Sequence, residues 1–170
     1  FIYGYKVGGI YQSEDEIEQY QSVYEDQVAN RDLVSPGDMW FQDVRGPAND
    51  QERFYSTTPD SIVNSNDRTF IGNTIPEYFY GLNLGASYKG FDISFFFQGL
   101  GGVDKYNSEL SKGVSMSSTG INQWSNTLNR WTPNNMNVWD PNNKANSLPR
   151  AVRNDPAGNN RYSDRFVESA

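Results

Sequence analysis

Residues 78–100 read YFYGLNLGASYKGFDISFFFQGL, and they carry the clearest structural pattern of the chain. Apolar residues alternate with small or polar residues on both sides of Lys89-Gly90. Because successive side chains of a strand point to opposite faces, this period of two predicts two β-strands of about ten residues each. Glycine tolerates a positive φ and lysine is well solvated, so we expect Lys89-Gly90 to form the tight turn of a hairpin.

The two faces of the expected hairpin differ in chemistry. One face carries the larger apolar side chains, which are Tyr80, Leu82, Leu84, Ala86 and Tyr88 from the first strand and Phe91, Ile93, Phe95 and Phe97 from the second. The other face carries Gly81, Asn83, Gly85 and Ser87, then Asp92, Ser94 and Gln98, with Phe96 as the one exception. Side chains this small and polar cannot build a dry core, so we expect only one face to be buried in an apolar medium.

Two interpretations of the hairpin remain open on the pattern alone. A soluble β-sandwich also has alternating strands, but these usually run about five to six residues. A transmembrane β-barrel needs strands of about 9–11 residues with aromatic side chains at both ends. Tyr78 and Phe79 open the first strand, while Tyr88 and Phe91 flank the turn.

The overall composition indicates ordered polar loops more than a large aliphatic core. Hydrophobic residues make up 36% of the 170 residues, below the roughly 45–50% of an average globular domain. Aromatic residues nevertheless reach 15%, which is too many for simple disorder. We therefore expect long loops that contact a ligand or a partner.

Charge and residue types exclude several classes of function. The net charge of -7 argues against nucleic acid and anionic lipid surfaces as partners, because both require clusters of Lys and Arg. The absence of Cys and His removes disulfides, the Ser-His-Asp and Cys-His arrangements and the usual zinc sites. A glycosidase would need a defined pair of carboxylates, and no pair stands out among the 21 Asp and Glu residues. We expect a protein that is not an enzyme.

Two helices are expected outside the hairpin. Ser13 and Glu16 form a capping-box pattern, and the apolar spacing that follows predicts an amphipathic helix over residues 14–28. A second helix is expected from Thr119 to Pro133, where four apolar residues recur at helical spacing, namely Ile121, Trp124, Leu128 and Trp131.

The polar stretch 43–67 has two interpretations. Its oxygen-bearing side chains could ligate calcium, and they are Asp43, Asn49, Asp50, Asp60, Asn64, Asn66 and Asp67. The stretch lacks the D-x-[DN]-x-[DN]-G spacing of a known calcium loop, so a solvated loop without cofactor is the favoured interpretation.

The most distinctive stretch of the chain is NDRTFIGNTIPEYFYGLNLGASYKGFDISFFFQGLGG at residues 66–102. Further stretches are YGYKVGGIYQSEDEI (3–17), PGDMWFQDV (36–44), RWTPNN (130–135), Leu148-Pro149-Arg150 and SDRFVESA (163–170). In this order, the stretches resemble the C-terminal barrel segment of the SusC/RagA-type TonB-linked outer-membrane transporters of Bacteroidetes. The family often has an Asp-x-Asn-Gly-Asp-Gly run where this chain has DVRGPANDQERF (43–54), so a calcium site is not carried over from the family to this loop.

The resemblance implies a fold and an organisation. The chain would be an all-β fragment of a transmembrane antiparallel barrel, with residues 78–100 as one membrane hairpin and with short helices in the loops. Residues 1–77 and 101–170 would be mainly extracellular loops, and Lys89-Gly90 would face the periplasm. All 170 residues would belong to the C-terminal barrel domain of a longer polypeptide, whose plug domain lies outside this chain.

The resemblance also implies a function, which is TonB-dependent import of glycans or oligopeptides across the outer membrane. The partners would be a SusD-like surface lipoprotein and TonB, the latter reached through the N-terminal part that this chain lacks. Exposed indoles in polar loops suit sugars, so the candidate ligand-binding residues are Trp40, Trp124, Trp131 and Trp139. The alternative is a soluble all-β carbohydrate-binding module, which shares the aromatic and Asn-rich composition.

Overall fold

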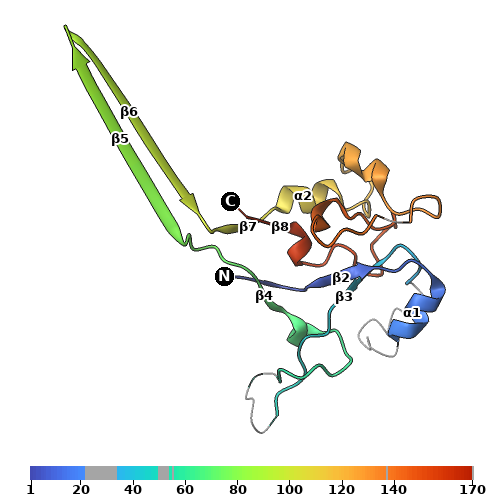
Figure 1. Ribbon diagram of the computed structural model, residues 1–170. Helices are drawn as coiled ribbons and strands as arrows, with labels where there is room; N and C mark the ends of the chain where they lie inside the picture. Colours follow the sequence, from blue (N-terminus) through green and yellow to red (C-terminus); the bar gives the residue numbers. More distant parts are fainter. Residues whose placement is uncertain (22–33, 50–53, 55, 137, 170) are drawn as a thin grey trace.

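A computed structural model describes residues 1–21, 34–49, 54, 56–136 and 138–169. Strands are the main regular structure in these residues, and they pair into four small antiparallel sheets of two strands each (Figure 1). The all-β prediction is confirmed, and the described part of the chain contains no closed barrel. No helix in the described ranges has the length and apolar character needed to cross a bilayer.

The strands follow one another along most of the chain. They are β1 (Ile2–Gly4), β2 (Val7–Ile10), β3 (Met39–Phe41), β4 (Thr69–Gly72), β5 (Tyr78–Tyr88), β6 (Phe91–Gly101), β7 (Asp104–Tyr106) and β8 (Val167–Ser169). The helices are α1 (Glu14–Gln21) and α2 (Ser108–Gly113), with short 3-10 helices η2 (Ser65–Asp67), η3 (Ser125–Asn129), η4 (Lys144–Asn146) and η5 (Asp164–Phe166).

The hairpin β5–β6 has the register that the alternation predicts. Leu82 lies opposite Phe97 and Leu84 lies opposite Phe95, so the apolar rows of both strands share one face. The turn residues Lys89 and Gly90 have φ values of 47° and 85°. Two left-handed residues in a two-residue loop match the right-handed twist of the strands that they join. The second strand runs to Gly101, one residue beyond the predicted limit.

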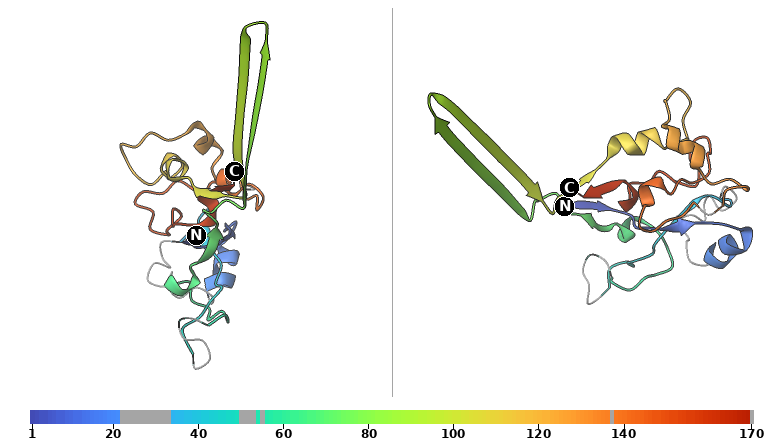
Figure 2. Two further views of the ribbon diagram at one scale, coloured as in Figure 1. Left: turned by 90° about the vertical axis from the view of Figure 1, so that its left-hand side faces the viewer. Right: turned by 45° about the horizontal axis from the view of Figure 1, so that its top comes forward.

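The hairpin projects from the rest of the molecule as a long ribbon (Figures 1 and 2). Leu84 and Phe95, in the middle of its apolar face, are 50% and 55% exposed. A β-sandwich would require a second sheet over this face. Among the described residues no such sheet covers it.

The segments before and after the hairpin form one body. Ladder β1–β4 lies on the N-terminal side of the hairpin base and ladder β7–β8 lies on the C-terminal side. A parallel bridge joins Tyr5 to Ser163, across most of the sequence. The larger core cluster combines residues from both segments, namely Tyr5, Val7, Ile10, Met39, Phe41 and Val63 with Trp131. A smaller cluster contains Leu110, Val114, Leu148 and Phe166.

The helix expected at residues 14–28 is confirmed for Glu14–Gln21, and the remainder of that prediction lies outside the described residues. The helix expected from Thr119 is wrong. In this stretch the structure has only the 3-10 helix Ser125–Asn129, which contains Leu128 at 78% exposure. Trp131, two residues beyond that helix, is buried. The Trp124 N–H donates to the Gly113 carbonyl instead of to a preceding helical turn, so tertiary contacts replace the regular helix.

Helix α2 was not expected from the sequence. Asn107 caps it by accepting a hydrogen bond from the Leu110 N–H at 2.8 Å, and an Asn at this position is a recognised start signal. Six residues are too few to show a convincing apolar period, which explains why the pattern did not reveal the helix.

Candidate functional site: a tryptophan-lined pocket

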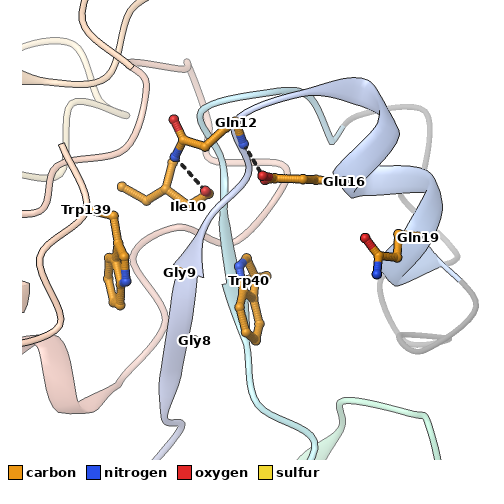
Figure 3. Close-up of a pocket in the computed structure, with 8 residues that line it drawn as sticks. All are labelled: Gly8, Gly9, Ile10, Gln12, Glu16, Gln19, Trp40 and Trp139. Atoms are coloured by element: carbon orange, nitrogen blue, oxygen red, sulfur yellow. Dashed lines mark hydrogen bonds between the residues drawn. The ribbon is translucent and has the colours of Figure 1, made fainter. Parts of the chain in front are cut away.

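Two of the four candidate tryptophans line the same pocket. The pocket has a volume of about 420 Å³ and lies where β2, β3 and α1 meet. Its lining residues are Gly8, Gly9, Ile10, Gln12, Glu16, Gln19, Trp40 and Trp139 (Figure 3). Helix α1, which contributes Glu16 and Gln19 to the lining, lies at the end of the body that is far from the hairpin (Figure 1).

A β-bulge in β2 makes room for the indole of Trp40. Gly9 lies opposite Trp40 while Val7 lies opposite Phe41, so Gly8 is the extra residue. A Cβ on Gly8 would lie 1.9 Å from the Trp40 ring, and one on Gly9 would lie 2.6 Å from it. The indole therefore occupies space that any other residue at these two positions would fill. This contact fixes the ring against the backbone of β2.

Trp139 provides a second indole. Figure 3 shows Trp40 and Trp139 on the two sides of the Gly8-Gly9 segment. Both rings are half-buried, and both pack against the larger core cluster on the side that is turned away from solvent. The pocket thus has two aromatic walls that the core supports and holds in place.

Gln12 lies at the edge of the pocket with its carboxamide held at both ends. Its Nε2 donates to the Ile10 carbonyl at 2.7 Å, and its Oε1 accepts from the Trp131 indole N–H at 3.0 Å. One N–H and one lone pair of the carboxamide remain available, because the group has two donors and two acceptor positions. A fixed carboxamide of this kind can both donate to and accept from a ligand.

Glu16 brings the one ionisable side chain among the described lining residues. The Ser13 hydroxyl accepts from the Glu16 N–H at 3.3 Å, as the capping box predicts. The Glu16 carboxylate, however, accepts from the Gln12 N–H at 2.7 Å, one residue before the expected partner. This shift directs the carboxylate toward the pocket (Figure 3).

The other two candidate tryptophans lie elsewhere. Trp131 is 7% exposed in the core cluster and reaches the pocket only through its hydrogen bond to Gln12. Trp124 is 46% exposed and packs on Gly113 at the end of α2.

Sequence reasoning found the two indoles but missed Gln12, Glu16 and Gln19. The Gly8-Gly9 pair was the available signal, since two glycines in a strand indicate close approach of another group.

The carboxylates of the 43–67 stretch serve the local backbone. Asp67 is fully buried and accepts from the Val44 N–H at 2.8 Å and from the Asn64 N–H at 2.7 Å. Asp43 accepts from the Ser61 N–H at 2.6 Å, and burial followed by the neighbouring Asp67 raises the pKa of Asp43. Within the described ranges, no three Asp or Glu residues are grouped to hold a metal ion, and Asp50 lies outside them.

Comparison with known proteins finds similarity to receptors of one kind. No family model matches it. It is 27% identical over 134 residues to TonB-dependent receptor P3 of Formosa agariphila, which covers 79% of this chain and 11% of P3. It is 28% identical over 83 residues to TonB-dependent receptor P26 of the same organism, which covers 49% of this chain and 8% of P26.

This weak and partial homology supports the TonB-dependent receptor family, whose members are outer-membrane transporters rather than enzymes. The matched regions span only about a tenth of the length of either relative.

Proposed function

We propose that this chain is part of the C-terminal β-barrel of a SusC/RagA-type TonB-dependent transporter in the outer membrane. The transporter would import glycans or oligopeptides together with a SusD-like surface lipoprotein, and TonB would supply the energy through the N-terminal part of the protein. Residues 78–100 would cross the membrane, while residues 1–77 and 101–170 would be mainly extracellular loops.

The hairpin carries this proposal. Its strands have 11 residues each, the length that a tilted strand needs to cross a bilayer. One face is apolar along its whole length, and the other is mostly small and polar. In hydrocarbon every backbone group must be paired, so the outer edges of β5 and β6 require neighbouring strands of a closed barrel.

The shape of the molecule supports the orientation. The two-residue turn lies at one end of the ribbon, and the loop body lies at the other (Figure 1). Outer-membrane barrels have short periplasmic turns and long extracellular loops.

The Trp40–Trp139 pocket would then open outside the cell, where substrate arrives. Those two indoles are the proposed ligand contacts. Trp131 would support them from the core, and Trp124 would be available to a ligand or to the lipoprotein elsewhere on the loops.

The two faces of the hairpin provide the test. In the full-length receptor, Leu84→Arg places a charge on the proposed lipid face. This variant should lower the free energy of unfolding by about 2–4 kcal/mol. Asn83→Arg places the same charge on the proposed water-facing side at nearly the same depth and should be tolerated. Folding titrations into lipid vesicles measure both values.

Equal costs for the two variants would contradict the proposed facing. A wild-type protein that stays monomeric in buffer without detergent and binds sugar there would instead favour the soluble carbohydrate-binding module.

A further inference from the structure

We infer that the Trp40–Trp139 pocket is a subsite for an uncharged pyranose, so that the substrate is a neutral glycan and not an acidic glycan or an acidic peptide. This inference rests on the proposed import function and narrows its substrate class. Three features of the pocket support it, namely its rigid aromatic walls, its carboxamides and its charge.

The aromatic walls suit the apolar C–H faces of a sugar ring. Trp40 is held on the backbone of Gly8 and Gly9, and Trp139 packs against the same core cluster. Large rings that are already fixed lose little conformational entropy when a ligand stacks on them. A pocket of about 420 Å³ lies toward the small end of ligand sites, which run from about 300 to 1,000 Å³, and suits a short piece of a glycan.

The polar groups suit hydroxyls. A hydroxyl both donates and accepts, and so does a carboxamide. Gln12 offers one N–H and one lone pair from a side chain that Ile10 and Trp131 already hold in place. The carboxylate of Glu16 keeps an oxygen beyond the one bonded to the Gln12 N–H, and that oxygen can accept from a sugar hydroxyl.

The charge of the pocket disfavours acidic ligands. Glu16 is the one charged side chain among the described lining residues, and none of these residues is Lys or Arg. A uronate or sulfate group would meet the Glu16 carboxylate and no cation among the described lining residues. The carboxylates of an acidic peptide would meet the same charge, and binding sites for carboxylates normally supply Arg. A neutral sugar avoids both costs.

An array of immobilised ligands tests the inference with the labelled, full-length receptor in detergent. The array carries neutral hexasaccharides of glucose, mannose, xylose and galactose, hexagalacturonate, sulfated galactan oligosaccharides and hexapeptides. We expect the wild type to retain neutral glycans. Trp40→Ala and Trp139→Ala should each weaken that binding at least about tenfold. Leu128→Ala, at a side chain that is 78% exposed and outside the pocket, should change it less than about twofold.

Glu16→Gln tests the charge argument without removing a pocket wall. Glutamine keeps an oxygen acceptor for the Gln12 N–H but loses the negative charge. Because an amide oxygen accepts from a sugar hydroxyl more weakly than a carboxylate does, affinity for neutral glycans should fall. The ratio of the affinity for hexagalacturonate to the affinity for neutral glycans should rise at least about fivefold, which corresponds to the loss of one charge pair about 4 Å apart in water.

Three results would overturn the inference. They are retention of acidic glycans or peptides but no neutral glycan, retention of no ligand on the array, and unchanged neutral binding by correctly folded Trp40→Ala and Trp139→Ala proteins. These failures differ from a failure of the proposed function. Equal costs for Leu84→Arg and Asn83→Arg would refute the membrane role whatever the array shows, whereas a protein that passes that test and retains only acidic glycans refutes the neutral subsite alone.

Discussion

Asp38 shows how single residues hold the loop body together. Its carboxylate is fully buried and accepts from the Nε and Nη2 atoms of Arg150 at 2.8 and 2.9 Å. It also accepts from the Asn159 side chain at 2.9 Å and from the Ser35 N–H at 2.9 Å. One side chain therefore connects the Pro-Gly-Asp stretch, which precedes the hairpin, with the Leu-Pro-Arg stretch, which follows it. Two of the motifs that carry the family resemblance therefore contact each other in the structure.

Asp38→Ala should lower the free energy of unfolding by about 3–5 kcal/mol, because it removes a buried carboxylate that accepts hydrogen bonds from Arg150, Asn159 and the Ser35 N–H. The exposed pair of Glu109 and Lys112 provides the control, since Glu109→Ala should change the stability by less than about 0.5 kcal/mol. Denaturant titrations of the full-length receptor measure both. A loss of under 1 kcal/mol for Asp38→Ala would contradict the central role of this contact.

Asp43 provides a prediction that depends on pH. Burial and the neighbouring Asp67 raise its pKa, so the folded state holds the Asp43 proton more tightly than the unfolded state does. The charged carboxylate therefore opposes folding at neutral pH, and this penalty is lost as the pH falls through the folded pKa. Asp43→Asn can still accept from the Ser61 N–H and can donate to Asp67, so it should stabilise the protein at pH 7.

The gain should be below about 1 kcal/mol, because Asp43 is only partly buried. It should vanish below the ordinary aspartate pKa of about 4. Thermal unfolding at both pH values measures it, and an Asn variant that is less stable than the wild type at pH 7 would contradict this assignment.

We also propose that the 43–67 stretch needs no calcium, so millimolar calcium should leave the melting temperature of the wild type unchanged.

At the scale of the element, the hairpin has different requirements at its base and along its length. At the base, the rings of Tyr78 and Tyr80 lie over Gly101 and Gly99 on the opposite strand. A Cβ on Gly99 would lie 2.5 Å from the Tyr80 ring. Further along, a Cβ on Gly85 would meet nothing closer than 3.9 Å. The glycines near the body accommodate aromatic side chains, whereas those further out keep one face small.

Gly99→Ala and Gly85→Ala should therefore act in opposite directions. The first displaces the end of the Tyr80 side chain and should cost about 1 kcal/mol. The second removes backbone freedom from the unfolded chain without a clash, and it should be neutral or stabilise by up to about 1 kcal/mol. Folding titrations into vesicles compare the two. Equal effects would show that the ring of Tyr80 does not depend on the space above Gly99.

At the scale of the whole molecule, the segments before and after the hairpin fold as one body. Trp131, from the segment after the hairpin, is buried among residues of the segment before it. It lies against Gly37, whose φ of 95° few other residues tolerate, and it donates to Gln12 at the pocket. The stability of the body and the shape of the pocket therefore depend on the same contact.

Trp131→Ala should lower stability by about 3–5 kcal/mol through loss of a large buried side chain. It should also weaken ligand binding although Trp131 is no wall of the pocket, because Gln12 loses the partner that positions it. Leu128→Ala provides the control, since Leu128 is 78% exposed and should change neither property. Limited trypsin digestion follows the opening of the body. Unchanged cleavage in the Trp131 variant would contradict the claim that Trp131 holds the segments before and after the hairpin together.

The hairpin was predictable in detail because its information is local. Strand alternation and the turn residues are properties of neighbouring positions, and they set both the register and the faces of β5 and β6. The helix expected from Thr119 failed for the opposite reason. Its apolar spacing was correct for a helix, but Trp131 is drawn into a core whose other residues come from the first half of the chain.

Local patterns in the sequence were enough to predict an all-β chain with one long amphipathic hairpin, a turn at Lys89-Gly90 and aromatic residues in polar loops. They could not predict which tryptophans line the same pocket. Trp40 and Trp139 are distant in the sequence, and they share a pocket because the bulge at Gly8 receives one ring while the core supports the other. Contacts of this kind depend on how the whole body packs, so no short stretch of the sequence could specify them.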